Sequence, residues 1–147
     1  MKHVKRILLF LIVFAGVCVF GTKAQAQGMK ECTAHISDPE FAGIIEESMG
    51  NIVEYRANSR SLNVTVAAAR RYTTVYFDVN SGRSIQINAT LSKSGNVGII
   101  DADGYVRYVT GTRINHTFAI SQTNAYCVFV QNLNSVSITA TGSYSWN

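Results

Sequence analysis

Histidine, serine and cysteine are the side chains from which a hydrolytic site is built, because nucleophilic catalysis needs a nucleophile, a base and an orienting acid. Downstream of residue 26 the chain has His35 and His116, and neither lies in a recognisable hydrolase motif. His116 lies two residues from both Ile114 and Phe118, so in a strand its side chain points to the same side as theirs. We therefore expect a partly buried, hydrogen-bonded structural histidine. Metalloprotease, P-loop and dinucleotide-binding motifs are absent from the sequence. The sequence therefore predicts a protein that is not an enzyme, with no catalytic residue and no cofactor.

Two aspartates, Asp101 and Asp103, resemble the opening of a calcium-binding loop, which needs clustered carboxylate and carbonyl oxygens. Tyr105 and Arg107 occupy positions at which further oxygen ligands would be required. Aspartate also favours turns, because its side chain bonds its own backbone. We therefore predict a turn here and no metal site, with calcium as the weaker alternative.

Two cysteines, Cys32 and Cys127, remain downstream of residue 26, an even pair in a chain that we expect to enter an oxidising compartment. We predict a disulfide between them, to which the chain-entropy model assigns about 4 to 5 kcal/mol for a loop of this length. The alternative is two separate buried thiols.

Aromatic side chains in the predicted strands are candidates for recognition, since Tyr and Trp supply contact area at low entropic cost. Strand parity and the adjacent turn predict that Tyr76 and Tyr105 are exposed, and with Tyr108 they form the tentative binding set. Tyr144 and Trp146 have the inward parity of the last strand, so we expect them to cap the core. Outward rows of Ser, Thr and Asn predict a flat polar face, for which the alternative is an ordinary solvated sheet face.

The chain begins like a secretory precursor. Lys2, Lys5 and Arg6 precede an apolar run of fourteen residues, 7–20, and the segment then ends in Ala24-Gln25-Ala26, a pattern that signal peptidase accepts. A membrane-spanning helix needs about 20 apolar residues, so cleavage is favoured over anchoring. We predict a signal peptide at 1–26 and one secreted domain at 27–147, extracellular or periplasmic and without a membrane span.

The charge of the predicted domain differs from that of the whole chain. The full sequence carries +4, whereas residues 27–147 contain nine Lys and Arg and nine Asp and Glu. A neutral domain gives no reason to expect nucleic acid or an anionic membrane as a partner. The remaining partner classes are a glycan, a cell-wall polymer or a protein.

From Ser61 onward, apolar and polar residues alternate with period two, as in strands with one face on a core. The clearest runs are 62–66, 75–79, 85–91, 114–120 and 136–146. Val97 to Ile100 and Tyr105 to Val109 flank the predicted turn and form a hairpin with it. Tyr126 to Val130 has apolar residues on both sides of the predicted strand, as a central strand covered on both faces does. About eight strands predict an antiparallel β-sandwich or jelly roll, with a small barrel as the alternative.

One short helix is predicted before these strands. Ser37 or Asp38 would cap it and Pro39 would lie in its first turn. Its apolar positions would be Phe41, Ile44, Ile45 and Met49, with Gly50 as the stop signal. Gly43, inside the pattern, weakens this prediction.

The order of elements from Tyr72 to Trp146, about half of the precursor, resembles the pre-peptidase C-terminal domains of exported bacterial proteins. The resemblance lies in Val75-Tyr76-Phe77-Asp78-Val79, Ser84-Ile85-Gln86-Ile87, the Gly98 to Tyr105 hairpin, His116-Thr117-Phe118-Ala119-Ile120, Ala125-Tyr126-Cys127-Val128-Phe129-Val130 and Val136-Ser137-Ile138-Thr139-Ala140. It implies a non-catalytic β-sandwich. This chain differs in standing alone, without a protease, and no functional residue is carried over.

Three functional interpretations follow. The first is a secreted, non-catalytic module whose exposed aromatics and polar sheet face bind a surface polymer, a glycan or a protein. The alternative is a small secreted effector, such as a toxin, bacteriocin or inhibitor, that acts through a loop. A hydrolase ranks third, because the sequence offers no set of nucleophile, base and orienting group.

Overall fold

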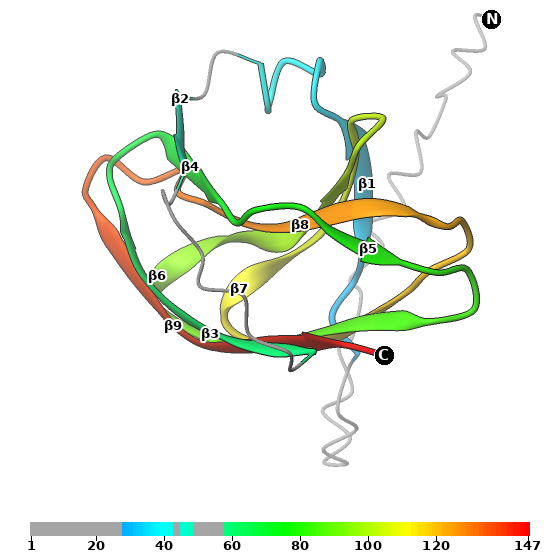
Figure 1. The fold of residues 1–147 in the computed structure, drawn as a ribbon. Helices are drawn as coiled ribbons and strands as arrows, with labels where there is room; N and C mark the ends of the chain where they lie inside the picture. The colour runs from blue at the N-terminus through cyan, green and yellow to red at the C-terminus, as the bar shows by residue number, and fades with distance from the viewer. Residues whose placement is uncertain (1–27, 43–44, 49–57) are drawn as a thin grey trace, which may run out of the picture.

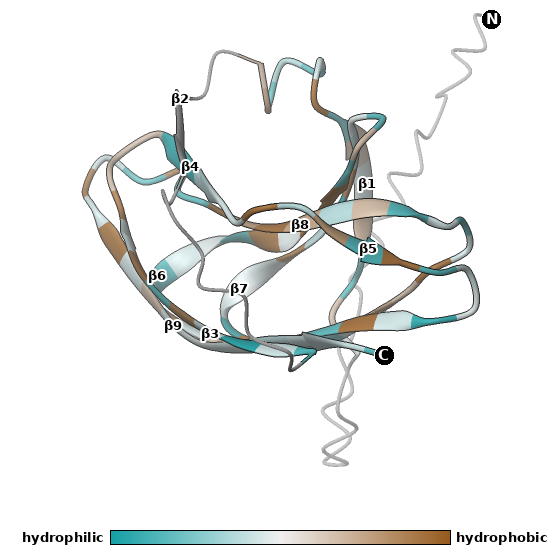
Figure 2. Ribbon diagram, in the orientation of Figure 1, coloured by the Kyte–Doolittle hydropathy of each residue, from teal (hydrophilic) through white to brown (hydrophobic). Residues whose placement is uncertain are grey.

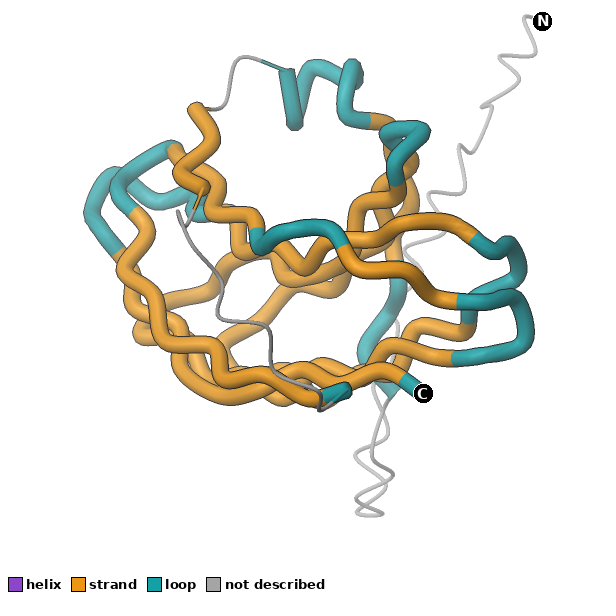
Figure 3. The backbone as a smooth tube through the Cα atoms, viewed as in Figure 1, coloured by secondary structure: helices purple, strands orange, loops and turns teal. Residues whose placement is uncertain are grey.

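The computed structural model describes residues 28–42, 45–48 and 58–147, so the predicted signal peptide at 1–26 lies outside the described residues. The described residues form strands joined by loops and contain no helix (Figures 1 and 3). The strands are β1 (Cys32–His35), β2 (Ile45–Ser48), β3 (Ser59–Val66), β4 (Arg70–Thr73), β5 (Phe77–Val79), β6 (Ser84–Asp101), β7 (Tyr105–Ala119), β8 (Asn124–Gln131) and β9 (Ile138–Trp146). No helix in these ranges is long and apolar enough to cross a membrane.

A long, bent hairpin of β6 and β7 organises the fold. The first part of β6, up to Leu91, pairs with β9, which in turn pairs with β3. The second part, from Asn96 onward, pairs with β8. Between these parts the β6–β7 register shifts, at Thr90 to Gly95, and the hairpin curves from one layer of the fold into the other (Figure 1).

The remaining strands extend the second layer. The hydrogen-bonded order is β1-β7-β6-β8-β4-β2, and β5 pairs with β8. The strand pairs are antiparallel except β2 and β4, which are parallel. The predicted all-β, sandwich-like fold is confirmed, although the runs predicted as separate strands at 85–91 and 97–100 are one continuous strand, β6.

The larger core lies between the two layers. Along β3 from Leu62 to Val66, and along β6 from Ile85 to Leu91, every second side chain is buried, and apolar and polar residues alternate along the ribbons in Figure 2. These side chains meet Phe77, Phe118 and others in a single cluster. Burying one such Val, Leu, Ile or Phe side chain contributes about 1.5 to 3 kcal/mol, so this cluster is the main source of stability.

A second, smaller core covers the opposite face of β8. It contains Phe41, Ile100, Val106, Cys127 and Phe129. The segment that precedes β2 lies over this core: Phe41 packs edge-on against Phe129 at 5.9 Å between ring centroids, and Gln131 Nε2 donates a hydrogen bond to the Glu40 carbonyl. Strand β8 is therefore covered on both faces, as its apolar sequence predicts.

The helix predicted from Asp38 to Met49 is wrong wherever this segment is described. Asp38 begins a turn, with hydrogen bonds from the amides of Phe41 and Ala42 to its carbonyl. The backbone of Ile45–Ser48 then forms β2, which pairs with β4, while the positions of Ile44, Met49 and Gly50 lie outside the described residues. Burial of Phe41 on the sheet and strand pairing at 45–48 override a local helix signal that Gly43 already weakens.

Candidate functional site

The turn between β6 and β7 explains both aspartates of the calcium candidate. Asp101 is buried, and its Oδ1 accepts hydrogen bonds from the amides of Asp103 at 3.0 Å and Tyr105 at 2.9 Å. Asp103 Oδ2 accepts a hydrogen bond from Asn124 Nδ2, and Gly104 has a φ of 90°, which a residue without a Cβ adopts at little cost. The described residues contain no group of three or more His, Cys, Asp or Glu side chains placed to hold a metal ion. The aspartates here shape a turn.

The three candidate tyrosines do not form one site. Tyr76 and Tyr105 are exposed, at 51% and 62%, as predicted. They lie in different parts of the fold: Tyr76 is in the segment between β4 and β5, next to Phe77 of the larger core, and Tyr105 begins β7, next to Val106 of the smaller core.

The third tyrosine, Tyr108, is half-buried and serves the smaller core. Its ring packs edge-on against Phe41 at 5.6 Å, and its hydroxyl lies 3.5 Å from the Glu40 carboxylate. Burial, with the nearby Glu40 and Cys32, raises the pKa of Tyr108. A ring held in this way contributes to the fold, and the binding role of Tyr108 stays a prediction.

His116 belongs to a charged cluster that ties the N-terminal segment to β7. Its Nε2 lies 3.0 Å from Glu31 Oε2, while Arg107 Nε donates to Glu31 Oε1 at 2.5 Å. Arg107 also lies over the ring of Phe118 and donates to the Ala119 carbonyl. Burial raises the pKa of Glu31, but the hydrogen bonds and charges of Arg107 and His116 outweigh it and lower that pKa overall. The predicted partly buried, hydrogen-bonded histidine is confirmed.

His35 is also held by local hydrogen bonds. Its Nδ1 lies 3.3 Å from the Ser37 amide, which is only a donor, so Nδ1 is an acceptor and the ring proton lies on Nε2. That Nε2 lies 3.2 Å from the Asp103 carbonyl, and the Ser37 hydroxyl donates to Nδ1 at 2.7 Å. The ring thereby links the start of the segment over the smaller core to the β6–β7 turn.

Cys32 and Cys127 are not joined by a disulfide within the described part of the chain. Cys32 lies on β1 and Cys127 on β8, and β7 and β6 lie between these strands. Three inter-strand steps of about 4.8 Å therefore separate them along the sheet, whereas a disulfide needs Cα atoms within about 7 Å. The predicted bridge is therefore not part of this fold. The prediction failed because the alternation of residues along a strand does not reveal how many strands lie between two cysteines.

The loop between β8 and β9 carries a feature that strand alternation did not predict. Leu133 and Val136 expose 62% and 48% of their surface. Val136 falls at the start of the predicted last strand, but β9 begins only at Ile138. The signal in the sequence was the run Asn132-Leu133-Asn134-Ser135-Val136, in which turn-forming residues separate two aliphatic ones.

Buried Asn132 holds this loop in place. Its Nδ2 lies within 3.0 Å of the carbonyls of Val66, Ala67 and Val136, and its Oδ1 accepts from the amide of Asn134. One further contact joins the loop to β6, since Asn134 Nδ2 donates to the Ser94 carbonyl. Just after the loop, in β9, the amide of Thr139 donates to Ser92 Oγ of β6. The two exposed aliphatic side chains therefore stand on a fixed backbone.

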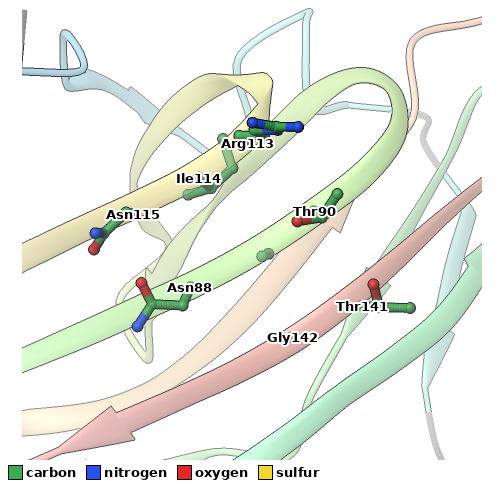
Figure 4. Close-up of a pocket in the computed structure, with 8 residues that line it drawn as sticks. Asn88, Thr90, Arg113, Ile114, Asn115, Thr141 and Gly142 are labelled. Atoms are coloured by element: carbon green, nitrogen blue, oxygen red, sulfur yellow. The ribbon is translucent and has the colours of Figure 1, made fainter.

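The predicted polar face is formed by the outer side of β3, β9, β6 and β7. On it Asn88 pairs with Asn115 and Ser143, and Thr90 pairs with Arg113 and Thr141. A shallow hollow of about 350 Å³ is lined by Asn88, Ala89, Thr90, Arg113, Ile114, Asn115, Thr141 and Gly142 (Figure 4). The Ser, Thr and Asn residues that the sequence predicts to face outward thus lie together on one surface.

No family model and no curated protein matches the chain. Similar solved structures include PliG, a periplasmic inhibitor of g-type lysozyme, from Aeromonas hydrophila and from Salmonella Typhimurium. Each has a TM-score of 0.46 and 10% identity, over 69% of this chain and 97% of that chain. A de novo designed double-stranded β-helix has a TM-score of 0.35 and 16% identity, over 60% of this chain and 99% of that chain. At these values no functional conclusion is drawn from the likeness.

Proposed function

We propose that this chain is a secreted, non-enzymatic effector or inhibitor that binds a protein partner through the loop from Asn132 to Ser137. The observation that carries the proposal is the exposure of Leu133 and Val136 on a loop whose backbone is fixed by buried Asn132. The basic start and apolar run before Ala26 support export. The dispersed tyrosines favour a loop over an aromatic face as the contact surface.

Rigidity matters because association is opposed by the ordering of loops at an interface, and a loop already held in its bound conformation avoids that loss. The hydrogen bonds of Asn132 and Asn134 join the loop to two other segments, the end of β3 at Val66 and Ala67, and β6 at Ser94. The loop is therefore part of the folded framework and presents its side chains in a defined arrangement.

The chemistry of the loop indicates a protein as the partner. Two exposed aliphatic side chains on a loop fit an apolar depression, and the buried centre of a protein interface is depleted of charged residues. Complete burial of a Leu or Val contributes about 1.5 to 3 kcal/mol each. A neutral glycan offers no comparable apolar pocket.

The proposal is tested by replacing Leu133 with a photo-crosslinking amino acid in the purified protein and exposing it to proteins of the compartment into which it is exported. We expect one dominant adduct from position 133 and none of that mass from position 102, where exposed Ala102 occupies the β6–β7 turn. Identical adducts from both positions, or none from position 133, would rule out the loop as the contact surface.

The identified partner then allows a quantitative comparison. Leu133→Asp is expected to weaken binding about 30-fold or more, because it removes an apolar contact and buries a charge. Ala102→Asp serves as the matched control and should bind like the unmodified protein. Purified g-type lysozyme is one defined probe for the same measurement. Equal affinities of the two variants for the crosslinked partner would contradict the proposal.

A further inference from the structure

The outer face of β3, β9, β6 and β7 is almost free of charge. Sixteen side chains have outward parity on it, and fourteen of them carry an uncharged hydroxyl or amide, Arg113 and Ala119 being the exceptions. They are Ser59, Ser61, Asn63 and Thr65 of β3, Ser84, Gln86, Asn88 and Thr90 of β6, Arg113, Asn115, Thr117 and Ala119 of β7, and Thr139, Thr141, Ser143 and Ser145 of β9. Soluble proteins are designed with about 25 to 35% charged residues on their surface, and this face carries fewer.

The strand registers arrange these groups as a lattice. One row across the four strands is Ser61, Ser143, Asn88 and Asn115, and the next is Asn63, Thr141, Thr90 and Arg113. Neighbouring strands lie about 4.8 Å apart, and alternate residues along a strand about 6.8 Å apart. Hydroxyl and amide groups both donate and accept hydrogen bonds, so the lattice offers closely spaced partners of both kinds.

A hollow lies within this lattice. Asn88 and Asn115 stand side by side on adjacent strands, with Thr90, Arg113 and Thr141 around them (Figure 4). Its floor includes Gly142, with a φ of 151°, where an added Cβ would lie 2.0 Å from the Asn88 carbonyl oxygen. The close approach of β9 to β6 therefore requires glycine, and the hollow of about 350 Å³ is shallow and open to solvent.

We infer that this face is a second binding surface, distinct from the β8–β9 loop, and that its ligand is a neutral polysaccharide. A neutral ligand rich in hydroxyl groups matches a surface of hydroxyls and amides without charge. An anionic polymer would need more cations than the single Arg113. The centre of a protein interface is enriched in aromatic residues, Met and Arg and depleted of Ser, and Arg113 is the sole member of the enriched group among these sixteen side chains.

The test is electrophoresis of the purified protein through native gels that contain laminarin, dextran, galactomannan or, for comparison, heparin. We expect retardation by at least one of the three neutral polymers and none by heparin. The double variant Asn88→Glu/Thr141→Glu should bind about tenfold more weakly, because it replaces hydrogen-bonding partners in the hollow with two like charges. Ala102→Glu, which adds charge at the exposed β6–β7 turn, should be retarded like the unmodified protein.

Far-ultraviolet circular dichroism and melting curves establish that the variants are folded. Leu133→Asp should keep full retardation, which separates this proposal from that for the loop. Unretarded migration of the folded protein in all three neutral polymers, equal retardation of the double variant, or retardation by heparin alone would overturn the inference. A dimer in solution that dissociates in the double variant would also overturn the inference, because the face would then bind a second copy of the chain.

Discussion

The rings of Phe77 and Trp146 are stacked, with centroids 4.2 Å apart and planes at 25°. The guanidinium of Arg60 lies over the same indole at 5.3 Å, so Trp146 is covered on more than one side although it is only partly buried. This arrangement closes the larger core where the last strand ends, as the inward parity of Trp146 predicts.

Replacing Trp146 with Ala should therefore destabilise the protein by about 3 kcal/mol, the lower end of the range for Trp or Phe replaced by Ala in a core. Urea unfolding followed by circular dichroism measures the change. Tyr76→Ala is the control, since an exposed side chain usually changes stability by about 0.5 kcal/mol or less. Equal losses in the two variants would contradict the assignment of Trp146 to the core.

The Glu31 cluster predicts a defined pH dependence. The folded-state pKa of Glu31 lies below its ordinary value of about 4.5, so its contribution to stability is complete above that value and is lost as the pH falls through the folded-state pKa. Glu31→Gln should remove this contribution, and the difference in stability between the unmodified protein and the variant should shrink below pH 4.5. Unfolding at a series of pH values measures it, with Asp78→Asn as an exposed control. A difference that grows on acidification would show that the sign is wrong.

Asn132 is expected to be the most sensitive position of the β8–β9 loop. Asn132→Asp places a carboxylate against the carbonyls of Val66, Ala67 and Val136 in a buried site, and we expect a loss of about 3 kcal/mol from repulsion and unsatisfied hydrogen bonds. Ser135→Asp adds the same charge at an exposed position of the same loop and should be nearly neutral. Thermal melting distinguishes the two, and similar melting temperatures would mean that Asn132 does not anchor the loop.

The two cysteines should respond unequally to replacement by serine. Cys127 is buried among Phe41, Ile100 and Phe129, so Cys127→Ser buries a hydroxyl and should destabilise the protein by about 1 to 3 kcal/mol. Cys32 is partly exposed, and Cys32→Ser should cost about 0.5 kcal/mol. Urea unfolding without reductant compares them. Two large and equal losses would instead indicate a shared disulfide.

The sequence predicts most of the fold because alternation reports directly which side of a strand is buried. Leu62 to Val66, Ile85 to Leu91 and Tyr144 with Trp146 lie on the predicted faces, and the apolar run at Tyr126 to Val130 identifies a strand covered on both sides. The predicted hairpin turn at Asp101 is also confirmed, because its turn chemistry is local.

Predictions that depend on distant parts of the chain were less successful. The helix signal near Phe41 is local, whereas the burial of Phe41 depends on β8, about 90 residues later in the sequence. The order of the strands in the sheet cannot be derived from periodicity. Without it, the sequence could not show whether Cys32 reaches Cys127 or whether Tyr76 lies near Tyr105. The resemblance to pre-peptidase C-terminal domains and the cleavage after Ala26 stay predictions.

The shared hairpin of β6 and β7 has a consequence for the order of folding. Its two strands are joined by only Ala102, Asp103 and Gly104, so little chain entropy opposes their meeting. The partners of β6 are farther away: β9 docks on its first part and β8 on its second. We therefore expect the hairpin to form early and to serve as a common template, onto which both layers assemble and without which neither nucleates.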